Sequence, residues 1–267
     1  MKLKHLASAI IMGSISCGAA ATAIQGNSLQ SQLDALSDGN FYDVNNAQHT
    51  PDEQWEINAS NGSVARLLFE SADFENIASF GIYDIADTSN RLRIFEASAY
   101  VPFVGPVGGS CGTAEASCPP FSNNFEVVVN DTPGEFNDGL YQFSGGLLGE
   151  SATFSSNRFG FYLDSGDGTF FSEVSKNSDG TDHMVAYRGD GSLGFDINGG
   201  TDYSPLGTGE YIMAFEDLNA NNPDYDGDFD DFVFLMESVT AVPEPGTLAL
   251  LGLGLAGLGA ARRRQKA

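Results

Sequence analysis

Short runs of β-branched and aromatic residues recur along the chain from Trp55 onward, separated by stretches that contain Gly, Asn, Asp and Ser. Apolar runs of this length, bounded by turn residues, are typical of β-strands. Between Phe80 and Ile85 alternate residues fall on opposite faces, as they do in an extended strand. The pattern predicts strands over residues 64–69, 77–85, 92–99, 125–129, 159–163, 170–174, 184–187, 211–215 and 232–239.

Many short strands separated by turns predict an all-β fold, specifically an antiparallel β-sandwich or a jelly-roll-like domain. The 32 glycines suit such turns, and the lack of long helical periodicity excludes Rossmann and TIM-barrel folds. One short helix is expected over 28–36, where Leu29, Leu33 and Leu36 share a face and Gly39 follows. We therefore expect a leader at 24–54 and the β domain at 55–241.

The chain is strongly acidic, with 36 Asp and Glu against 12 Lys and Arg and a formal net charge of −24. Half of the basic residues lie in the two terminal segments, so the middle of the chain is more acidic still. Nucleic acids are held mainly by Lys and Arg. The charge thus argues against a nucleic-acid partner and favours cations as ligands.

The N-terminus has the layout of a secretory signal peptide. Lys2 and Lys4 precede an apolar run that extends to Ala20, and Ala21-Thr22-Ala23 reads as a cleavage site. We therefore assign residues 1–23 to a signal peptide. Two cysteines, Cys111 and Cys118, remain after its removal, and export makes a disulfide between them the expected state.

The C-terminus has a second targeting layout. Val242-Pro243-Glu244-Pro245 precedes an apolar run at 247–261, and a cluster of arginines follows it. This layout, over 242–267, resembles the PEP-CTERM sorting signal of Gram-negative bacteria. The resemblance implies a transmembrane segment at about 247–261, transient anchoring in the inner membrane, cleavage by an exosortase near Pro243, Glu244 and Pro245, and release or surface attachment. Such proteins accompany exopolysaccharide production and biofilms. A permanent single-span anchor is the alternative.

Seven carboxylates crowd into residues 216–231. Side by side they repel one another and raise one another's pKa values, and hard cations such as calcium relieve this repulsion through oxygen ligands. The loop is not an EF-hand, because Val233 stands where the bidentate Glu would be if Asn222 were the first position. We predict a Ca²⁺ site here, to which Asp224 and Asp230 are possible contributors. A merely solvated acidic turn is the alternative.

The same region, together with the Phe-Gly-x-Tyr stretches that begin at Phe80 and Phe159, resembles the DUF4114 family. The family's closing motif is similar to Phe215-Glu216-Asp217-Leu218 followed by residues 226–234, although Asp230 stands where the family prefers Asn. The resemblance implies an extracellular β-sandwich module of surface proteins and adhesins that has calcium sites and no assigned reaction. The ligands that it implies are Glu216, Asp217, Asp226, Asp228 and Asp231.

Other polar residues have two interpretations each. His183, which follows Asp182, is expected to be structural, hydrogen-bonded to the acidic loop or a strand end. The alternative is that His183 and Asp182 hydrogen-bond to the residues that bind the cation and so orient them. Asp164 and Asp167 flank Gly166 in what reads as an ordinary hairpin turn, and a contribution to a shared cation site is the alternative.

We predict from these features an exported, non-enzymatic calcium-binding module of the bacterial cell surface or extracellular matrix. Its expected partners are an exosortase during export, and extracellular polysaccharide or other surface proteins afterwards. A lectin-like carbohydrate-binding module is the alternative, because sandwiches often bind sugars through exposed aromatics. A glycoside hydrolase is a weaker alternative, because a suitable pair of acidic residues arises by chance in so acidic a chain. The aromatic candidates for sugar binding are Trp55, Tyr100, Tyr203 and Tyr225, although each of them is expected to be partly core instead.

Overall fold

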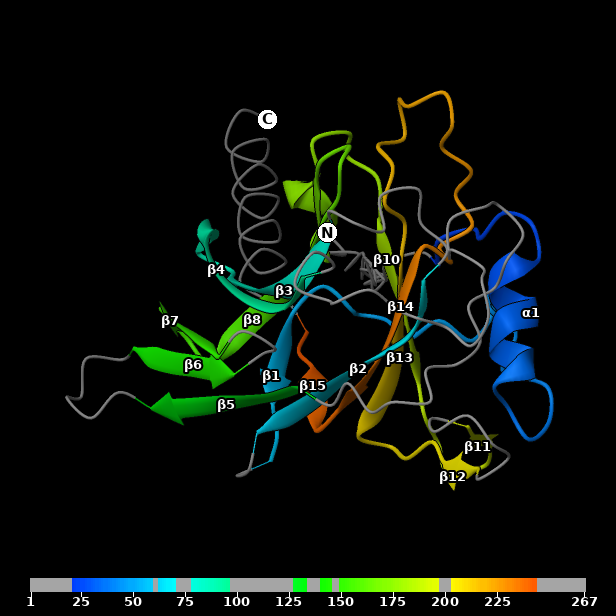
Figure 1. Ribbon diagram of the computed structural model, residues 1–267, viewed down its shortest axis with the longest axis horizontal. Coiled ribbons are helices and arrows are strands. Elements are labelled where there is room, and N and C mark those ends of the chain that lie inside the picture. The colour runs from blue at the N-terminus through cyan, green and yellow to red at the C-terminus, as the bar shows by residue number, and fades with distance from the viewer. Residues whose placement is uncertain are drawn as a thin grey trace, which may run out of the picture.

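The computed structural model of the protein describes residues 21–59, 62–70, 78–96, 127–133, 140–145, 149–196 and 203–243. It confirms the all-β antiparallel fold (Figure 1). Residues 1–20, Cys111, Cys118, Glu244, Pro245 and the apolar run at 247–261 lie outside the described residues, so the predictions made for them stay predictions. Within the described ranges, no helix has the length and apolar character needed to cross a membrane.

The first sheet has the strand order β15-β1-β8-β3-β4, and β9 pairs with β8 beside this path. All of its pairings are antiparallel. Its strands are β1 (Trp55–Ile57), β3 (Ser79–Asp84), β4 (Asp87–Glu96), β8 (Arg158–Asp164), β9 (Thr169–Phe171) and β15 (Val239–Ala241).

The second sheet, also antiparallel, has the order β10-β13-β14-β2-β5-β6-β7. Each of the nine predicted strands has a counterpart in one of the two sheets, with shifts of a few residues at the ends. A small ribbon and a 3₁₀ turn complete the fold. The remaining elements are β2 (Ser63–Glu70), β5 (Val127–Pro133), β6 (Tyr141–Gly145), β7 (Glu150–Phe154), β10 (Met184–Arg188), β11 (Gly194–Phe195), β12 (Ser204–Pro205), β13 (Glu210–Phe215), β14 (Phe232–Glu237) and η2 (Val174–Lys176).

The main core lies between the two sheets and is rich in phenylalanine. Phe80 of β3 stacks on Phe234 of β14 with ring centroids 3.9 Å apart. Trp55 of β1 is fully buried in the same core and meets Tyr211 of β13 edge to face. Contacts of this kind join the sheets face to face, as in a β-sandwich.

Three strands of the second sheet, β10, β13 and β14, are buried on both faces. In β14, Phe234 points into the main core while its neighbours Val233 and Leu235 point into a second core on the other side. That second core includes Leu29 and Leu33 of α1 (Ser28–Ala35), which is the helix predicted over 28–36. Figure 1 shows α1 beside β13 and β14, on the side away from β3 and β4. Burial on both faces explains why these strands read as continuous apolar runs.

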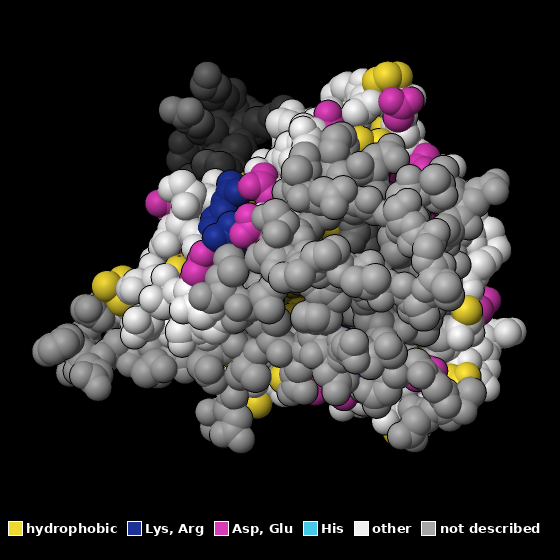
Figure 2. All heavy atoms as spheres, viewed as in Figure 1, with side chains coloured by type: hydrophobic (Ala, Val, Ile, Leu, Met, Phe, Trp, Pro, Cys, Tyr) yellow, Lys and Arg dark blue, Asp and Glu magenta, His cyan; other side chains and the backbone are white. Residues whose placement is uncertain are grey.

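The acidic composition shows on the molecular surface. Figure 2 shows one small cluster of Lys and Arg among the described residues of the visible face, flanked by Asp and Glu. Arg93 makes two short ion pairs, with nitrogen–oxygen distances of 2.7 Å to Glu96 and 2.6 Å to Glu150. Exposed pairs of this kind stabilise a fold by less than about 1 kcal/mol each.

Candidate metal centre

The hairpin formed by β13 and β14 brings the two ends of the acidic loop together. Phe215 and Phe232 are the last cross-strand pair of this hairpin. Glu216 and Asp217 follow Phe215 directly, and Asp231 precedes Phe232, so the first and last acids of the loop meet at one end of the sheet. The backbone N–H of Asp217 donates a hydrogen bond to Asp231 Oδ2 at 2.9 Å.

Inside the loop, two residues adopt left-handed backbone conformations. Gly227 has φ +68°, and Phe229 has φ +59°, which is unusual for a residue with a bulky side chain. The strain of such a conformation costs on the order of 1–3 kcal/mol. The ring of Phe229 is fully buried in the second core, and this burial offsets the strain. The buried ring thus fixes the path of the chain between Asp228 and Asp230.

The loop is also tied to the segment before the β domain. The backbone N–H of Gln25 donates to the carbonyl oxygen of Gly227 at 2.9 Å. From α1, the Ser28 hydroxyl and the Gln32 side-chain amide both donate to Asp230 Oδ2, the second at 2.6 Å. Segment 24–36 therefore helps to position the acidic loop.

Carboxylates of the loop form three groups in which one ligand atom from each member lies within 4.8 Å of the others. Oxygens that surround one calcium ion at about 2.4 Å span no more than this distance. Each group therefore has the spacing that a single bound cation requires. The groups are Glu216, Asp226 and Asp228; Glu216, Asp217 and Asp231; and Asp228, Asp230 and Asp231.

Glu216 is the most enclosed of these acids, with none of its surface exposed. Its Oε1 accepts a hydrogen bond from the Leu218 N–H at 3.3 Å, whereas its Oε2 is buried and has no hydrogen-bond donor among the described residues. Burial, followed by the charge of Asp226, raises the pKa of Glu216 to about 8. A buried carboxylate oxygen that lacks a donor is costly, and a cation would compensate it.

The same electrostatics extend to two further members of the groups. Burial, followed by the charge of Asp230, raises the pKa of Asp228 to about 7. Burial, followed by the charges of Asp217 and Glu216, raises the pKa of Asp231 well above its usual value. As long as no cation is bound, the loop therefore favours protons on carboxylates that are ordinarily ionised.

His183, which directly precedes β10, supports the start of the acidic loop. Its ring is fully buried and stacks on Phe170, with centroids 4.1 Å apart. Its Nδ1 faces the carbonyl oxygen of Glu216 at 3.2 Å, and its Nε2 lies 2.9 Å from Asp179 Oδ2 and 3.0 Å from the Thr181 hydroxyl. Both ring nitrogens are therefore engaged with protein atoms. In this position the ring braces the backbone of Glu216.

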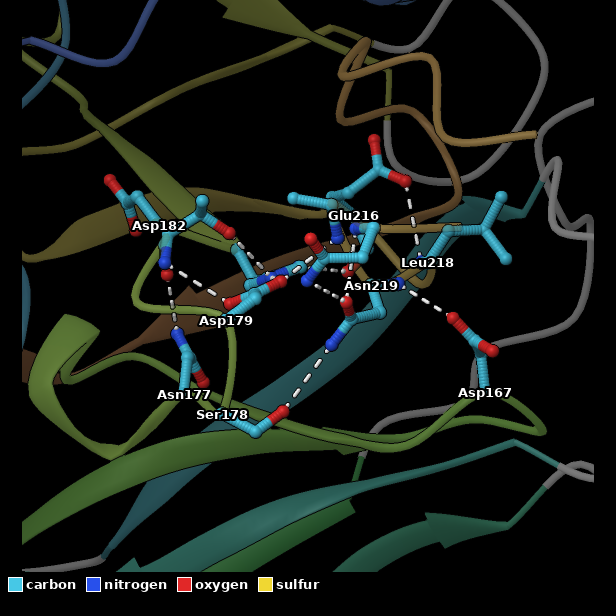
Figure 3. A network of polar contacts seen from close by, with 12 residues as sticks. Asp167, Asn177, Ser178, Asp179, Asp182, Glu216, Leu218 and Asn219 are labelled. Carbon is cyan, nitrogen blue, oxygen red and sulfur yellow. Dashed lines mark hydrogen bonds and ion pairs between the residues drawn. The ribbon is translucent and has the colours of Figure 1, made fainter. Parts of the chain in front are cut away.

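Asp179 is the hub of a hydrogen-bond network beside the loop (Figure 3). Its Oδ2 accepts from the backbone N–H of Ala220 at 2.9 Å, in addition to its contact with His183. Burial acts to raise the pKa of Asp179, but hydrogen bonds from Ala220, Thr181 and His183 outweigh it and hold the pKa at about 2. Figure 3 shows the Glu216 carboxylate pointing away from Asp179. The network thus holds the backbone of the loop in place, and the Glu216 carboxylate points instead toward the other acids of its groups.

The hairpin turn before β9 is a second support. Asp167 Oδ2 accepts from the Asn219 N–H at 2.7 Å, and the Ser165 hydroxyl donates to the carbonyl oxygen of Asp217 at 2.6 Å. Asp164 instead accepts from Thr169 and lies 3.9 Å from Arg91. Asp164 and Asp167 are therefore outside the three groups, and the turn acts here as a hydrogen-bond partner of the acidic loop.

The structure brings all five principal predicted ligands together, and Asp230 joins them in the third group. Asp224 is exposed and belongs to none of the three groups. Asp182 also lies outside them, where its carboxylate accepts from Thr22 at 2.5 Å and from the Met184 N–H at 3.2 Å. The sequence interpretation missed Asp179, although its i, i+4 spacing to His183 was a usable signal.

The described aromatic candidates for sugar binding differ in their burial. Trp55 is fully buried, and its Nε1 donates to the carbonyl oxygen of Asp52 at 2.7 Å, so it is a core residue and offers no surface to a sugar. Tyr203 is 36% exposed, and Tyr225, which lies within the acidic loop, is partly buried. Tyr100 lies outside the described residues.

Comparison with known proteins bears on the C-terminus. Residues 241–264 match the PEP-CTERM protein-sorting motif, close to the 242–267 expected from the sequence. No curated protein and no solved structure matches the chain significantly. The resemblance of the β domain to DUF4114 stays a prediction. The matched motif makes this chain a secreted, surface-directed protein that an exosortase processes during export.

Proposed function

We propose that the protein is a non-enzymatic module that binds calcium in the loop between β13 and β14 and acts at the cell surface or in the extracellular matrix. The observation that carries the proposal is Glu216, which is fully buried and has one carboxylate oxygen without a donor among the described residues. Glu216 also belongs to two of the carboxylate groups that have the spacing of calcium ligands.

The ligand chemistry favours calcium over other divalent cations. Zinc prefers nitrogen and sulfur ligands, and both nitrogens of His183 are already engaged with protein atoms. Magnesium usually keeps several waters and takes only one or two carboxylates. A loop that offers a cation three carboxylates at a time suits the larger and more flexible coordination of calcium. In one of the three groups, two of these carboxylates belong to the buried residues Glu216 and Asp217.

The site's enclosure supports a binding role over a catalytic one. Glycoside hydrolases need two carboxyl groups that flank the scissile bond of a sugar chain. Glu216 is fully buried and Asp217 is 1% exposed, so a polymer does not reach either carboxylate in this structure. Extracellular modules work in a calcium-rich medium, and weak affinities of about 10⁻⁴–10⁻³ M suffice there. Matrix polysaccharide and other surface proteins are the partners that we propose for the calcium-bound form.

The experiment is thermal unfolding of the secreted protein in calcium and in EDTA. Ligand linkage predicts a stabilisation of about 2.7 kcal/mol at a calcium concentration a hundredfold above the dissociation constant. In a matched pair of variants, Glu216→Gln reduces the calcium-dependent rise of Tm, whereas Asp224→Asn, in the same loop but outside the groups, keeps it in full. Identical melting curves in calcium and EDTA would overturn the proposal.

A further inference from the structure

We propose that the acidic loop holds two divalent cations, and that the carboxylate of Glu216 bridges them. The inference rests on the proposed function, because it requires that the loop binds cations at all. It goes further in assigning two separate sites, each with its own ligands, to a single loop.

The first step is the overlap between the carboxylate groups. Glu216, Asp228 and Asp231 each belong to two of the three groups. Any one cation position uses three of the six carboxylates and leaves the other three outside its ligand set. The loop therefore offers more carboxylates than one ion employs, and neighbouring positions share a ligand.

The second step is the choice between the three positions. In the group of Asp228, Asp230 and Asp231, one oxygen of Asp230 already receives two hydrogen bonds from α1, donated by Ser28 and Gln32. That group is therefore the least in need of a cation. The inner site is the group of Glu216, Asp217 and Asp231, and the outer site is the group of Glu216, Asp226 and Asp228.

The third step is the geometry of Glu216, which both sites share. A bridging carboxylate gives one oxygen to each ion. Oε2 of Glu216 is buried with no donor among the described residues, and Oε1 has a single long hydrogen bond of 3.3 Å from Leu218. Both oxygens can therefore accept a cation without breaking a short hydrogen bond.

The fourth step is charge. The two sites together contain five carboxylates. One divalent cation balances two of their negative charges, whereas two cations balance four. Four of these side chains are fully or partly withdrawn from water, where unbalanced charge is most costly: Glu216, Asp217, Asp228 and Asp231. Two ions therefore fit the loop better than one.

Calcium stoichiometry of the secreted protein tests the inference, measured by isothermal titration calorimetry and by native mass spectrometry. We expect two ions per chain. Asp217→Asn, at the inner site, and Asp226→Asn, at the outer site, each reduce the count to one. Glu216→Gln weakens both sites at least tenfold. Asp224→Asn is the matched control and retains two ions, and circular dichroism checks that each variant is folded.

Mn²⁺ is the probe for the bridge. Two metal ions that share a carboxylate lie about 3.5–4 Å apart, and two Mn²⁺ ions at that separation show spin coupling in electron paramagnetic resonance. Coupled spectra that become those of isolated Mn²⁺ in Asp226→Asn support the proposal. One ion per unmodified chain overturns the inference and leaves the proposed function intact, and no bound ion overturns both. Two ions without spin coupling overturn the bridge.

Discussion

The ring of Tyr83 lies across Gly160 of the neighbouring strand, in the space that a β-carbon on Gly160 would occupy. Such a β-carbon would stand 2.3 Å from Cζ of the tyrosine. The relationship is reciprocal, since Tyr162 lies across Gly81 in the same pair of strands. Both strands carry the sequence Phe-Gly-x-Tyr, and the antiparallel register places each glycine opposite the other strand's tyrosine.

We expect Gly160→Ala to destabilise the fold by about 1–3 kcal/mol, the usual cost of overpacking a buried site. Tyr83 cannot easily move away, because its ring meets Phe171 edge to face at 4.9 Å and its hydroxyl donates to Glu173 at 2.8 Å. Urea unfolding measures the change. Gly209→Ala is the control, because a β-carbon there meets nothing within 4 Å. Equal stability of the two variants would contradict this packing.

The helix before the β domain should contribute to stability as a core element. Leu33 of α1 is fully buried in the second core, so Leu33→Ala should lower the free energy of unfolding by about 2–5 kcal/mol. Ser31→Ala, on the exposed side of the same helix, should change it little. Both are measured by chemical denaturation. If the segment were a separable leader, the two variants would unfold alike.

Asp52 should make stability fall as the pH rises. Burial, followed by the charges of Asp182 and Glu53, raises the pKa of Asp52 from 3.8 to about 8. Between these two pH values Asp52 holds a proton in the folded state but has lost it in the unfolded state. The free energy of unfolding that Asp52 contributes therefore decreases as the pH rises. Asp52→Asn removes the effect. As the pH increases from about 4 to about 8 at constant calcium, the Tm of Asp52→Asn should therefore rise relative to the Tm of the unmodified protein. A difference in Tm that does not vary with pH would refute the assignment.

Replacing His183 separates a structural role from a role in cation binding. His183→Ala removes contacts to Asp179 and to the carbonyl oxygen of Glu216, and each buried polar group left without a partner costs about 1–3 kcal/mol. We therefore expect a lower Tm in EDTA as well as in calcium. If His183 acted only through the cation, the variant and the unmodified protein would melt together in EDTA and differ in calcium alone.

The sequence predicts much of the fold because burial leaves a local mark. Strands such as β13 and β14 are buried on both faces, so they appear as uninterrupted apolar runs. Some of the missed strands are very short: β11 and β12 have two residues each, and β1 has three. A strand of two or three residues is too short to show a periodic pattern in the sequence. The other missed strands, β6 and β7, have five residues each, but only Phe143 and Phe154 in them are buried, so they form no apolar run.

Part of the candidate site could be predicted from the sequence and part could not. Its carboxylates could be identified because they crowd into one loop of a hairpin, where neighbours in sequence are neighbours in space. The contacts that hold Asp230 could not, because Ser28 lies 202 residues away along the chain. Only the packing of α1 against the outer face of the second sheet brings the two together, and no local pattern encodes that packing.

The order of strands also determines when this chain can fold. β1 pairs with β15 and β2 pairs with β14, so the earliest strands of both sheets find partners among the latest. Sheets built from such distant pairings form slowly. The last of these strands ends at Ala241, the residue at which the sorting motif begins. The first sheet is not complete before Ala241 has been synthesised, and the second is not complete before Glu237, so neither sheet can close until almost the whole β domain is available.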